Sequence, residues 1–136
     1  MLGTTKFITL EAAKKMMAAG EAAARANGWT VAIAIVDASG GLIMFQKIDE
    51  TQPGSIAVAQ GKARTAALFK RPTKALEEVI AGGKTAFLAV DGIVPLQGGV
   101  PVIADGKIIG AVGVSGVMSA QDEQVAMAAV AVLQTS

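Results

Sequence analysis

Apolar and polar residues alternate along this chain with two different periods, and these periods predict which segments are helices and which are strands. Between Thr9 and Asn27 the apolar residues recur at helical spacing, which predicts a helix over Thr9–Asn27 with Thr9 as its N-cap. From Trp29 to Val36 the period is two and both sides are apolar, as expected for a central strand covered on both faces. After a turn at Asp37–Gly41, the segment Leu42–Ile48 predicts a second strand.

The middle of the chain predicts two helices separated by a short interruption. Ser55–Lys70 carries apolar residues at helical spacing, and Ser55 is the expected N-cap. Arg71-Pro72-Thr73 interrupts this pattern because proline is not tolerated inside a helix, and Lys74–Ala81 then predicts a second, shorter helix. Phe87–Val90 is too short an apolar segment to assign to a helix or a strand.

Towards the C-terminus the pattern predicts a hairpin followed by a last helix. Val100–Ala104 and Lys107–Ser115 have strand character, and Asp105-Gly106 between them is a two-residue turn sequence that tolerates positive φ. Pro101 restricts the first of these strands to the start or the edge of a sheet, because proline cannot donate a backbone hydrogen bond. Ser119 is the expected N-cap of the final helix.

These segments follow one another as helix, two strands, two helices, two strands and helix, without a linker or an internal repeat. Tight turns between consecutive strands favour an antiparallel sheet, and the helices must bury their apolar faces against it. A length of 136 residues is enough for one sizeable core. The sequence therefore predicts an α+β fold in a single domain over residues 1–136, with the first and last helices as neighbours.

The composition adds an expectation of self-association. Apolar residues make up 52% of the chain and the mean hydropathy is +0.52, which is high for a soluble monomer. On the final helix, Met127 and Val130 are expected on the outer side. The expected inner side consists of Asp122, Val125, Ala129, Val132 and Leu133. Apolar residues on an outer face indicate a partner, so we expect a homo-oligomer.

The same composition excludes or disfavours several classes of function. The sequence has no cysteine and no histidine, which removes disulfides, zinc sites built on those residues and a serine hydrolase triad, and we expect no metal site. A net charge of +1 and 4% aromatic residues argue against nucleic-acid binding. No apolar run reaches the roughly 18 residues of a membrane span. Because the N-terminus also lacks a signal-peptide pattern, we expect a cytoplasmic protein.

Three polar features remain as candidates for chemistry. Lys62 lies at the boundary of the apolar face of its helix, where it either meets an anionic ligand or is a surface lysine whose stem covers apolar residues. Gly98-Gly99 exposes backbone amides to close approach by a ligand, although it matches no phosphate-binding motif and a plain turn is the alternative. Asp122, near a helix start, is either an acid–base residue or a carboxylate that stabilises the helix end.

Separated motifs in this chain closely resemble the GlcG/HbpS family, in the family's order and over nearly the whole length. The motifs are VDASGGLIMFQKID from Val36, SIAVAQGKARTA from Ser55, GGVP from Gly98, IGAVGVSG from Ile109 and QDE from Gln121. The resemblance implies a profilin-like antiparallel sheet flanked by helices. It also implies compact homo-oligomers, often octamers, in agreement with the apolar composition.

The resemblance further implies a small-molecule-binding protein that is accessory to the catabolism of small carboxylates or diols. Members occur beside glycolate and diol metabolism genes, as haem-binding partners of extracellular sensors, and as the C-terminal domain of some cobalamin adenosyltransferases. Several haem-binding relatives use or are proposed to use histidines, and this chain has none, so haem would need an oxygen, methionine or lysine ligand. The alternative is an enzyme that deaminates or isomerises a small unsaturated carboxylate.

The candidate site combines these motifs with the residue arguments. Lys62 and Asp122 are the candidate catalytic residues. Lys62 and the Gly98-Gly99 amides would receive the carboxylate of an anionic ligand, and Asp122 would move a proton. The candidate ligand-binding residues are Ser55, Lys62, Gly98, Gly99, Pro101 and Ser115. We expect the pocket between the Ser55–Lys70 helix, the Gly98-Gly99 loop and the start of the final helix.

Overall fold

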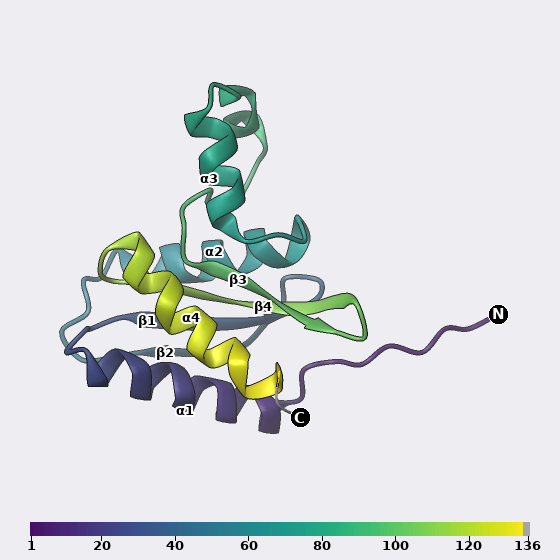
Figure 1. The fold of residues 1–136 in the computed structure, drawn as a ribbon, viewed down its shortest axis with the longest axis horizontal. Helices are drawn as coiled ribbons and strands as arrows, with labels where there is room; N and C mark the ends of the chain where they lie inside the picture. The colour runs from purple at the N-terminus through teal and green to yellow at the C-terminus, as the bar shows by residue number, and fades with distance from the viewer. Residues whose placement is uncertain (135–136) are drawn as a thin grey trace.

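A computed structural model describes residues 1–134, and the helices and strands follow the predicted order (Figure 1). The elements are α1 (Leu10–Ala26), β1 (Ala32–Asp37), β2 (Leu42–Lys47), α2 (Ser55–Leu68), α3 (Thr73–Ala81), the short 3₁₀ helix η1 (Thr85–Ala89), β3 (Gly99–Ala104), β4 (Lys107–Ser115) and α4 (Ser119–Gln134). The predicted single α+β domain is confirmed. Within residues 1–134 no helix combines the length and the apolar character needed to cross a membrane.

The sheet has the strand order β2-β1-β4-β3, and every neighbouring pair is antiparallel. Strand β1 is therefore central, as its two apolar sides predict, and β3 is an edge strand, as Pro101 requires. Asp105 and Gly106 have φ of 53° and 73°, so both residues of the β3–β4 turn adopt the left-handed conformation that their sequence favours. The hairpin prediction is confirmed.

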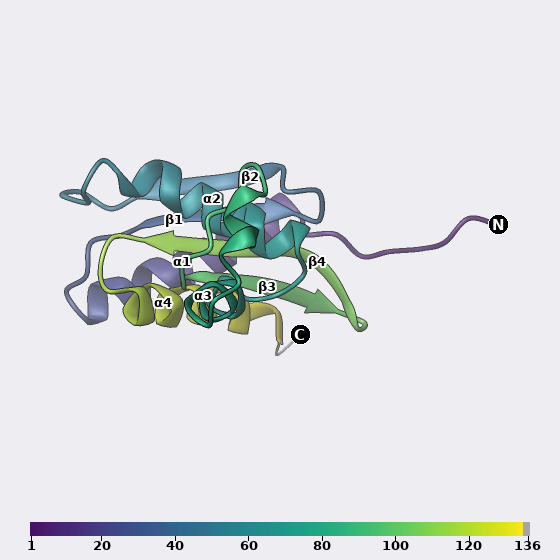
Figure 2. The same ribbon diagram turned by 90° about the horizontal axis from the view of Figure 1, so that it is seen from above.

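The two faces of the sheet are packed differently. Helices α1 and α4 lie side by side over one face (Figure 1), where large side chains form the main core. This core includes Met16, Met17, Ile33, Ile35, Val112, Val114 and Val125. Helix α2 covers the other face (Figure 2) through small side chains, namely Ala32, Ala34, Ala59, Ala63, Ala66, Ala67 and Ala111, together with Val36. Small residues allow α2 to approach the sheet closely.

Gly113 of β4 marks the closest point of this approach. A Cβ atom at Gly113 would meet the backbone of α2, at the carbonyl oxygen of Ala59 and at the amide nitrogen and Cα of Ala63. No side chain other than that of glycine fits between the strand and the helix here. This contact fixes how closely the helical turn that carries Lys62 approaches the sheet.

Three predicted helix starts are wrong by one residue. Gly54, not Ser55, occupies the N-cap position of α2, and the Ser55 side chain is buried instead of capping the helix. Thr73, which we placed in the interruption, is the first residue of α3. Ser119 is likewise the first residue of α4, where the amide of Asp122 donates to the Met118 carbonyl. Helix boundaries depend on such local hydrogen bonds, which sequence spacing does not specify.

Two predicted positions of apolar residues are also wrong. Val130 is buried at 7% exposure in the core between α4 and the sheet, whereas we expected it on the outer side with Met127. It lies one helical turn from Ala126 on the inner face, and Met127 alone is exposed as predicted. On α1, helical spacing also predicts Leu10 on the face of the buried Ala13, but Leu10 is 54% exposed.

Helix α3 and η1 project away from the body of the molecule (Figure 1). The chain leaves the body at the end of α2 and returns to it at Gly98 and Gly99. The 3₁₀ helix Thr85–Ala89 occupies most of the apolar segment that the sequence left unassigned. This projection brings the base of α3 beside the start of β3, where the candidate site lies.

Candidate functional site

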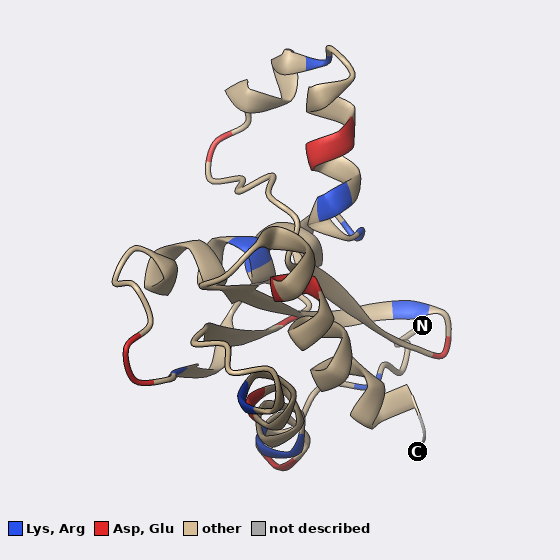
Figure 3. Cartoon of the chain, turned by 60° about the vertical axis from the view of Figure 1, so that its left-hand side comes forward, with Lys and Arg blue, Asp and Glu red and all other residues tan. Residues whose placement is uncertain are grey.

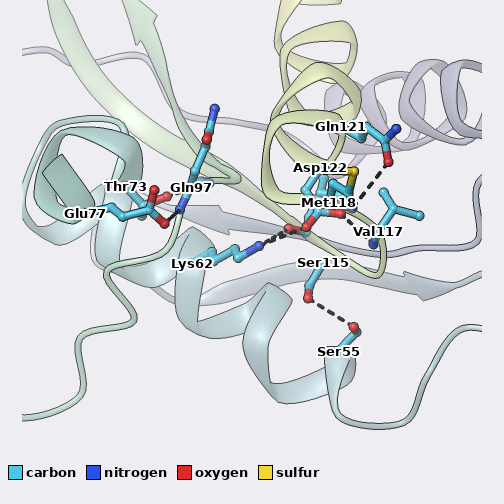
Figure 4. Close-up of polar contacts among 12 residues, drawn as sticks. Ser55, Lys62, Thr73, Glu77, Gln97, Ser115, Val117, Met118, Gln121 and Asp122 are labelled. Atoms are coloured by element: carbon cyan, nitrogen blue, oxygen red, sulfur yellow. Dashed lines mark hydrogen bonds and ion pairs between the residues drawn. The ribbon is translucent and has the colours of Figure 1, made fainter. Parts of the chain in front are cut away.

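Lys62 and Asp122 form a buried ion pair between α2 and α4 (Figure 4). The Nζ atom of Lys62 lies 3.2 Å from Oδ2 of Asp122, and both side chains are only 3% exposed. Lys62 also donates a hydrogen bond of 2.9 Å to the carbonyl oxygen of Val114 at the end of β4. The two candidate catalytic residues, which are 60 residues apart in the sequence and were predicted in one pocket, therefore contact each other directly.

Asp122 is held at both carboxylate oxygens. While Oδ2 accepts from Lys62, Oδ1 accepts a hydrogen bond of 3.1 Å from the backbone amide of Val117 in the loop before α4. Burial raises the pKa of Asp122 above its ordinary value, and this effect outweighs the opposing effects of the Lys62 charge and the two hydrogen bonds. Asp122 therefore takes up a proton more readily than a solvated aspartate. Of the two roles that we considered for Asp122, its carboxylate has the structural one, since it anchors the loop at the helix start, while the acid–base role stays a prediction.

The Gly98-Gly99 segment lies directly over the ammonium group of Lys62. Gly98 has φ of 135°, and a Cβ atom there would lie 2.7 Å from Nζ of Lys62. Its carbonyl oxygen accepts a hydrogen bond of 3.0 Å from the amide of Val114. Both the left-handed backbone and the short distance to Lys62 require glycine at this position. The segment is thus a tight cover over the ion pair.

Thr73 holds this cover in place, a role that no sequence pattern predicted. Its hydroxyl oxygen accepts a hydrogen bond of 2.8 Å from the amide of Gly99, and the residue is fully buried. The Gly99 amide, which we expected to receive a ligand carboxylate, is therefore already used within the protein. A threonine beside a proline at the start of a helix was the only local signal, and it is common at helix starts in general.

Replacing Thr73 with valine should lower the free energy of unfolding by about 1 to 3 kcal/mol, because valine preserves the shape but leaves the buried Gly99 amide without an acceptor. Thr73→Ser, which retains the hydroxyl, is the matched control and should lose less. Urea denaturation followed by the fluorescence of Trp29, the only tryptophan in the sequence, measures both. Equal stability of the valine variant and the wild type would show that the Gly99 amide finds another acceptor.

Ser55 and Ser115 form a second polar contact on the same face of the sheet. The hydroxyl of Ser115 donates to that of Ser55 at 3.0 Å (Figure 4), and Gln52 also donates to Ser55 at 3.1 Å. Ser115 follows Val114, whose carbonyl binds Lys62, so the two contacts are adjacent along β4. Pro101 is buried in β3, two residues beyond Gly99. The predicted residues are thus all buried and lie on α2, β3, β4, α4 and the loop before β3, with Pro101 paired to Ala111, four residues before Ser115 on β4.

Gln97 fastens the cover from outside, and it was not among the predicted residues. Its backbone amide donates to Oε1 of Glu77 on α3 at 3.2 Å, and its side-chain amide donates to Oε1 of Glu123 on α4 at 3.2 Å. All three residues are half-buried. The carboxylates of Glu77 and Glu123 therefore lie beside the Gly98-Gly99 cover, and the positive charge of Lys62 is already balanced by Asp122. An anionic ligand must compete with Asp122 for Lys62.

A separate cavity of about 350 Å³ lies at another part of the fold. It is lined by residues of the N-terminal segment, the β3–β4 hairpin and the end of α4, among them Phe7, Ile8, Val102, Ile109 and Leu133. None of the candidate site residues lines it. Among residues 1–134 there is also no group of three or more carboxylates placed to hold a metal ion.

Comparisons with known proteins agree on one family. The family model described as "Haem degrading protein HbpS-like" matches residues 8–131. Protein GlcG of Escherichia coli (strain K12) is 47% identical over 112 residues, which cover 82% of this chain and 84% of GlcG. The crystal structure of a double mutant of Streptomyces reticuli HbpS has a TM-score of 0.90 at 35% identity and covers 97% of this chain and 90% of that chain. The crystal structure of a PduOC complex with haem has a TM-score of 0.86 at 26% identity and covers 93% and 95%.

Proposed function

This chain belongs to the HbpS-like family, and from this premise we propose that it is a cytoplasmic, homo-oligomeric protein that binds a small molecule and is accessory to the catabolism of small carboxylates or diols. The observation that carries the proposal is the buried Lys62–Asp122 pair beneath the Gly98-Gly99 cover. A buried ion pair is a costly way to stabilise a fold, because well-packed apolar residues often do as well or better. Buried charges with perturbed pKa values concentrate at functional sites.

In the proposed binding mode, the carboxylate of the ligand replaces that of Asp122 as the ion-pair partner of Lys62. Since burial raises the pKa of Asp122, its carboxyl group can accept a proton and become neutral. The ammonium of Lys62 is then free to pair with the carboxylate of the ligand, which reaches it when the Gly98 cover moves aside. Such a charge-assisted contact contributes roughly 1.5 to 3 kcal/mol. A neutral diol would instead use the same groups as hydrogen-bond donors and acceptors.

The second candidate function is an enzyme that deaminates or isomerises a small unsaturated carboxylate. It is favoured by the same raised pKa, since a general acid–base residue works best when its pKa lies near the working pH. Lys62 would hold the carboxylate, and Asp122 would give a proton to, or remove one from, a carbon atom of the substrate. The two candidates differ only in whether Asp122 moves a proton during a turnover.

Haem is the ligand suggested by the family description and by the haem complex of PduOC, and the residues of this chain do not fit its usual ligation. The sequence contains no histidine and no cysteine to bind the iron. Lys62 is buried and already paired. The roles proposed here for Lys62 and Asp122 therefore do not involve haem. Haemin mixed with the protein should give no bis-histidine low-spin absorption spectrum, and its appearance would indicate a tag or a contaminant.

A titration experiment tests the proposed function. We expect calorimetry with glycolate, acrylate, propanediol and haemin to detect saturable binding of at least one of them by the wild type. For a carboxylate, Lys62→Met should weaken binding by about tenfold or more, corresponding to the contact energy given above. Lys14→Met, which removes an exposed lysine on α1, is the control and should bind like the wild type.

Asp122→Asn separates the two candidates. If the protein only binds its ligand, this variant changes affinity alone, and the wild type consumes none of the four compounds. If it is an enzyme, the variant should keep its affinity within a few fold but lose about 100-fold or more in turnover. Wild-type binding and turnover in both Lys62→Met and Asp122→Asn would show that the pair is purely structural and would overturn the proposal.

A further inference from the structure

Lys62 is the only buried lysine among the nine in the sequence, all of which lie within the described residues. Figure 3 shows a basic segment of α2 beside an acidic segment at the start of α4, where this lysine meets Asp122. The other eight lysines are exposed; they are Lys6, Lys14, Lys15, Lys47, Lys70, Lys74, Lys84 and Lys107. A lysine in water is protonated near neutral pH, and its ammonium has no lone pair with which to attack a carbon atom. Burial beside a proton acceptor is the environment that makes a lysine nucleophilic.

The ammonium group of Lys62 is not fully used within the protein. It has three N–H donors, and two acceptors are recorded for them among residues 1–134. These are Oδ2 of Asp122 at 3.2 Å and the carbonyl oxygen of Val114 at 2.9 Å. On the side of Gly98, a Cβ atom would lie 2.7 Å from Nζ, and glycine places no side chain there. Position 98 therefore adds no side chain between the nitrogen atom and a small molecule beneath the cover.

Asp122 is placed to take the proton that Lys62 must lose before it can attack. Figure 4 shows the two side chains pointing toward each other, with 3.2 Å between Nζ and Oδ2. Burial disfavours both charges, and transfer of one proton from Nζ to Oδ2 removes both at once. The amide of Val117 holds the carboxyl group in this orientation through Oδ1. The raised pKa of Asp122 favours the same transfer.

We propose that Lys62 forms a Schiff base with a small uncharged aldehyde, and that Asp122 transfers the protons of this reaction. The inference rests on the proposed function in placing the ligand against Lys62, and it goes beyond that function because the ligand becomes covalently bound. An aldehyde is the oxidation level between an alcohol and a carboxylate. Oxidation of a diol to a carboxylate therefore passes through this class of compound.

The reaction balances without an oxidant or a second reactant. Nζ of Lys62 passes one proton to Oδ2 of Asp122, and its lone pair forms a bond to the carbonyl carbon of the aldehyde. The carbonyl oxygen receives this proton, and then a second one from Nζ by the same route. The carbon–oxygen bond breaks, water leaves, and the nitrogen lone pair completes the C=N bond. The products are one water molecule and the protonated imine of Lys62, beside the restored carboxylate of Asp122.

The buried pair accommodates this adduct without losing its charge balance. A carboxylate ligand must replace Asp122 as the partner of Lys62, whereas a protonated imine keeps the positive charge and one N–H donor for Asp122. Lys62 is the only buried cation of the part of the chain that the structure describes, and the carboxylates of Glu77 and Glu123 lie beside the cover. An aldehyde that also carries a carboxylate would meet negative charge here without a second buried cation. The site therefore favours an uncharged aldehyde.

Reductive trapping of the wild type with propanal tests the covalent step. Cyanoborohydride converts an imine into a stable secondary amine, so each lysine that has reacted gains a propyl group, which tandem mass spectrometry locates after proteolysis. At neutral pH and low propanal concentration, Lys62 should be labelled at least about tenfold more than any exposed lysine. Because the comparison is made within one protein, it does not depend on the folding of a variant. Label confined to the exposed lysines and the N-terminal amine would overturn the proposal.

The wild type unfolded in urea is the control for this measurement. All nine lysines are then in water, so the preference for Lys62 should vanish. A preference that persists in urea would overturn the proposal as well, because it would not come from the folded site.

Asp122→Asn tests the proton transfer, because an amide oxygen does not take up the proton. Labelling of Lys62 should become about 100-fold slower, whereas Lys14→Met, which removes an exposed lysine, should leave it unchanged. Circular dichroism checks that both variants are folded. Equal labelling of Lys62 in folded Asp122→Asn and in the wild type would overturn the role of Asp122.

Glyoxylate, an aldehyde that carries a carboxylate, tests the preference for an uncharged ligand. Relative to the exposed lysines of the same sample, it should label Lys62 at least about tenfold less than propanal does, because the nearby carboxylates repel it. Equal relative labelling by the two aldehydes would overturn this preference.

Calorimetry separates this inference from the proposed function, because glycolate, acrylate and propanediol have no aldehyde group. Binding of one of them without preferred labelling of Lys62 would overturn the covalent step and leave the proposed function standing. Preferred labelling of Lys62 without binding of any of the four titrated compounds would support the covalent step and overturn the proposed function.

Discussion

Asp122→Ala should lower the free energy of unfolding by about 3 to 5 kcal/mol, which is the typical cost of removing one partner from a buried ion pair. The variant leaves the ammonium of Lys62 with 3% exposure and with the Val114 carbonyl as its remaining recorded acceptor. It also removes the acceptor of the Val117 amide. Urea denaturation at fixed protein concentration measures the loss, because the proposed self-association would make stability depend on concentration.

A double-mutant cycle shows how much of this loss comes from the pair itself. Lys62→Met alone should cost less than Asp122→Ala, because burial raises the pKa of Asp122 and lets the remaining carboxyl group become neutral by taking up a proton. In the combined variant the cost of Asp122→Ala should fall by at least about 2 kcal/mol, since no charge is then left buried alone. Additive losses would mean that Lys62 and Asp122 stabilise the fold through separate contacts.

Gly113→Ala should be nearly as damaging, with an expected loss of about 3 kcal/mol, the upper end of the usual cost of overpacking a core. The added methyl group would lie against the backbone of Ala59 and Ala63, which cannot rotate away as a side chain can. Helix α2 would have to move off the sheet, and Lys62 would move with it. The variant should therefore lose ligand affinity as well as stability.

Gly54→Ala is the control for this experiment. Gly54 has φ of −59° and ψ of −25°, which alanine adopts readily, and nothing lies within 4 Å of the position of an added Cβ atom. This variant should be more stable than the wild type by about 0.4 to 1 kcal/mol, because alanine reduces the freedom of the unfolded chain. If Gly113→Ala were as stable as Gly54→Ala, the close approach of α2 to β4 would be wrong.

Both large effects concern the position of one ammonium group. Gly113 allows α2 to lie close to the sheet, and this close packing buries the ammonium group of Lys62. Asp122 balances the buried positive charge. The Gly98 cover then separates the pair from solvent. A ligand that uses Lys62 must move this cover, so the hydrogen bonds of Gly99 and Gln97 set how readily it opens.

The sequence alone determined the order and type of nearly every element, because their signals are local. The alternation in β1, the turn residues Asp105 and Gly106, and the helical spacing in α2 each act over a few neighbouring positions. The position of β3 at the edge of the sheet also followed from one residue. Pro101 has no amide hydrogen to donate to a neighbouring strand, and this is a local property of the sequence. The motifs were sufficient to indicate the family, and the comparisons confirm it.

Only the tertiary structure decided what these residues contact. That Lys62 pairs with Asp122, and Ser55 with Ser115, depends on how α2 and α4 meet at the end of β4, and each pair spans 60 residues. The role of Thr73 depends on the return of the chain at Gly99. Helical spacing assigned Val130 to the wrong side, because the packing of α4 against α1 and the sheet sets which arc is inner. Contacts between distant segments arise from packing and loop closure, and no local pattern encodes them.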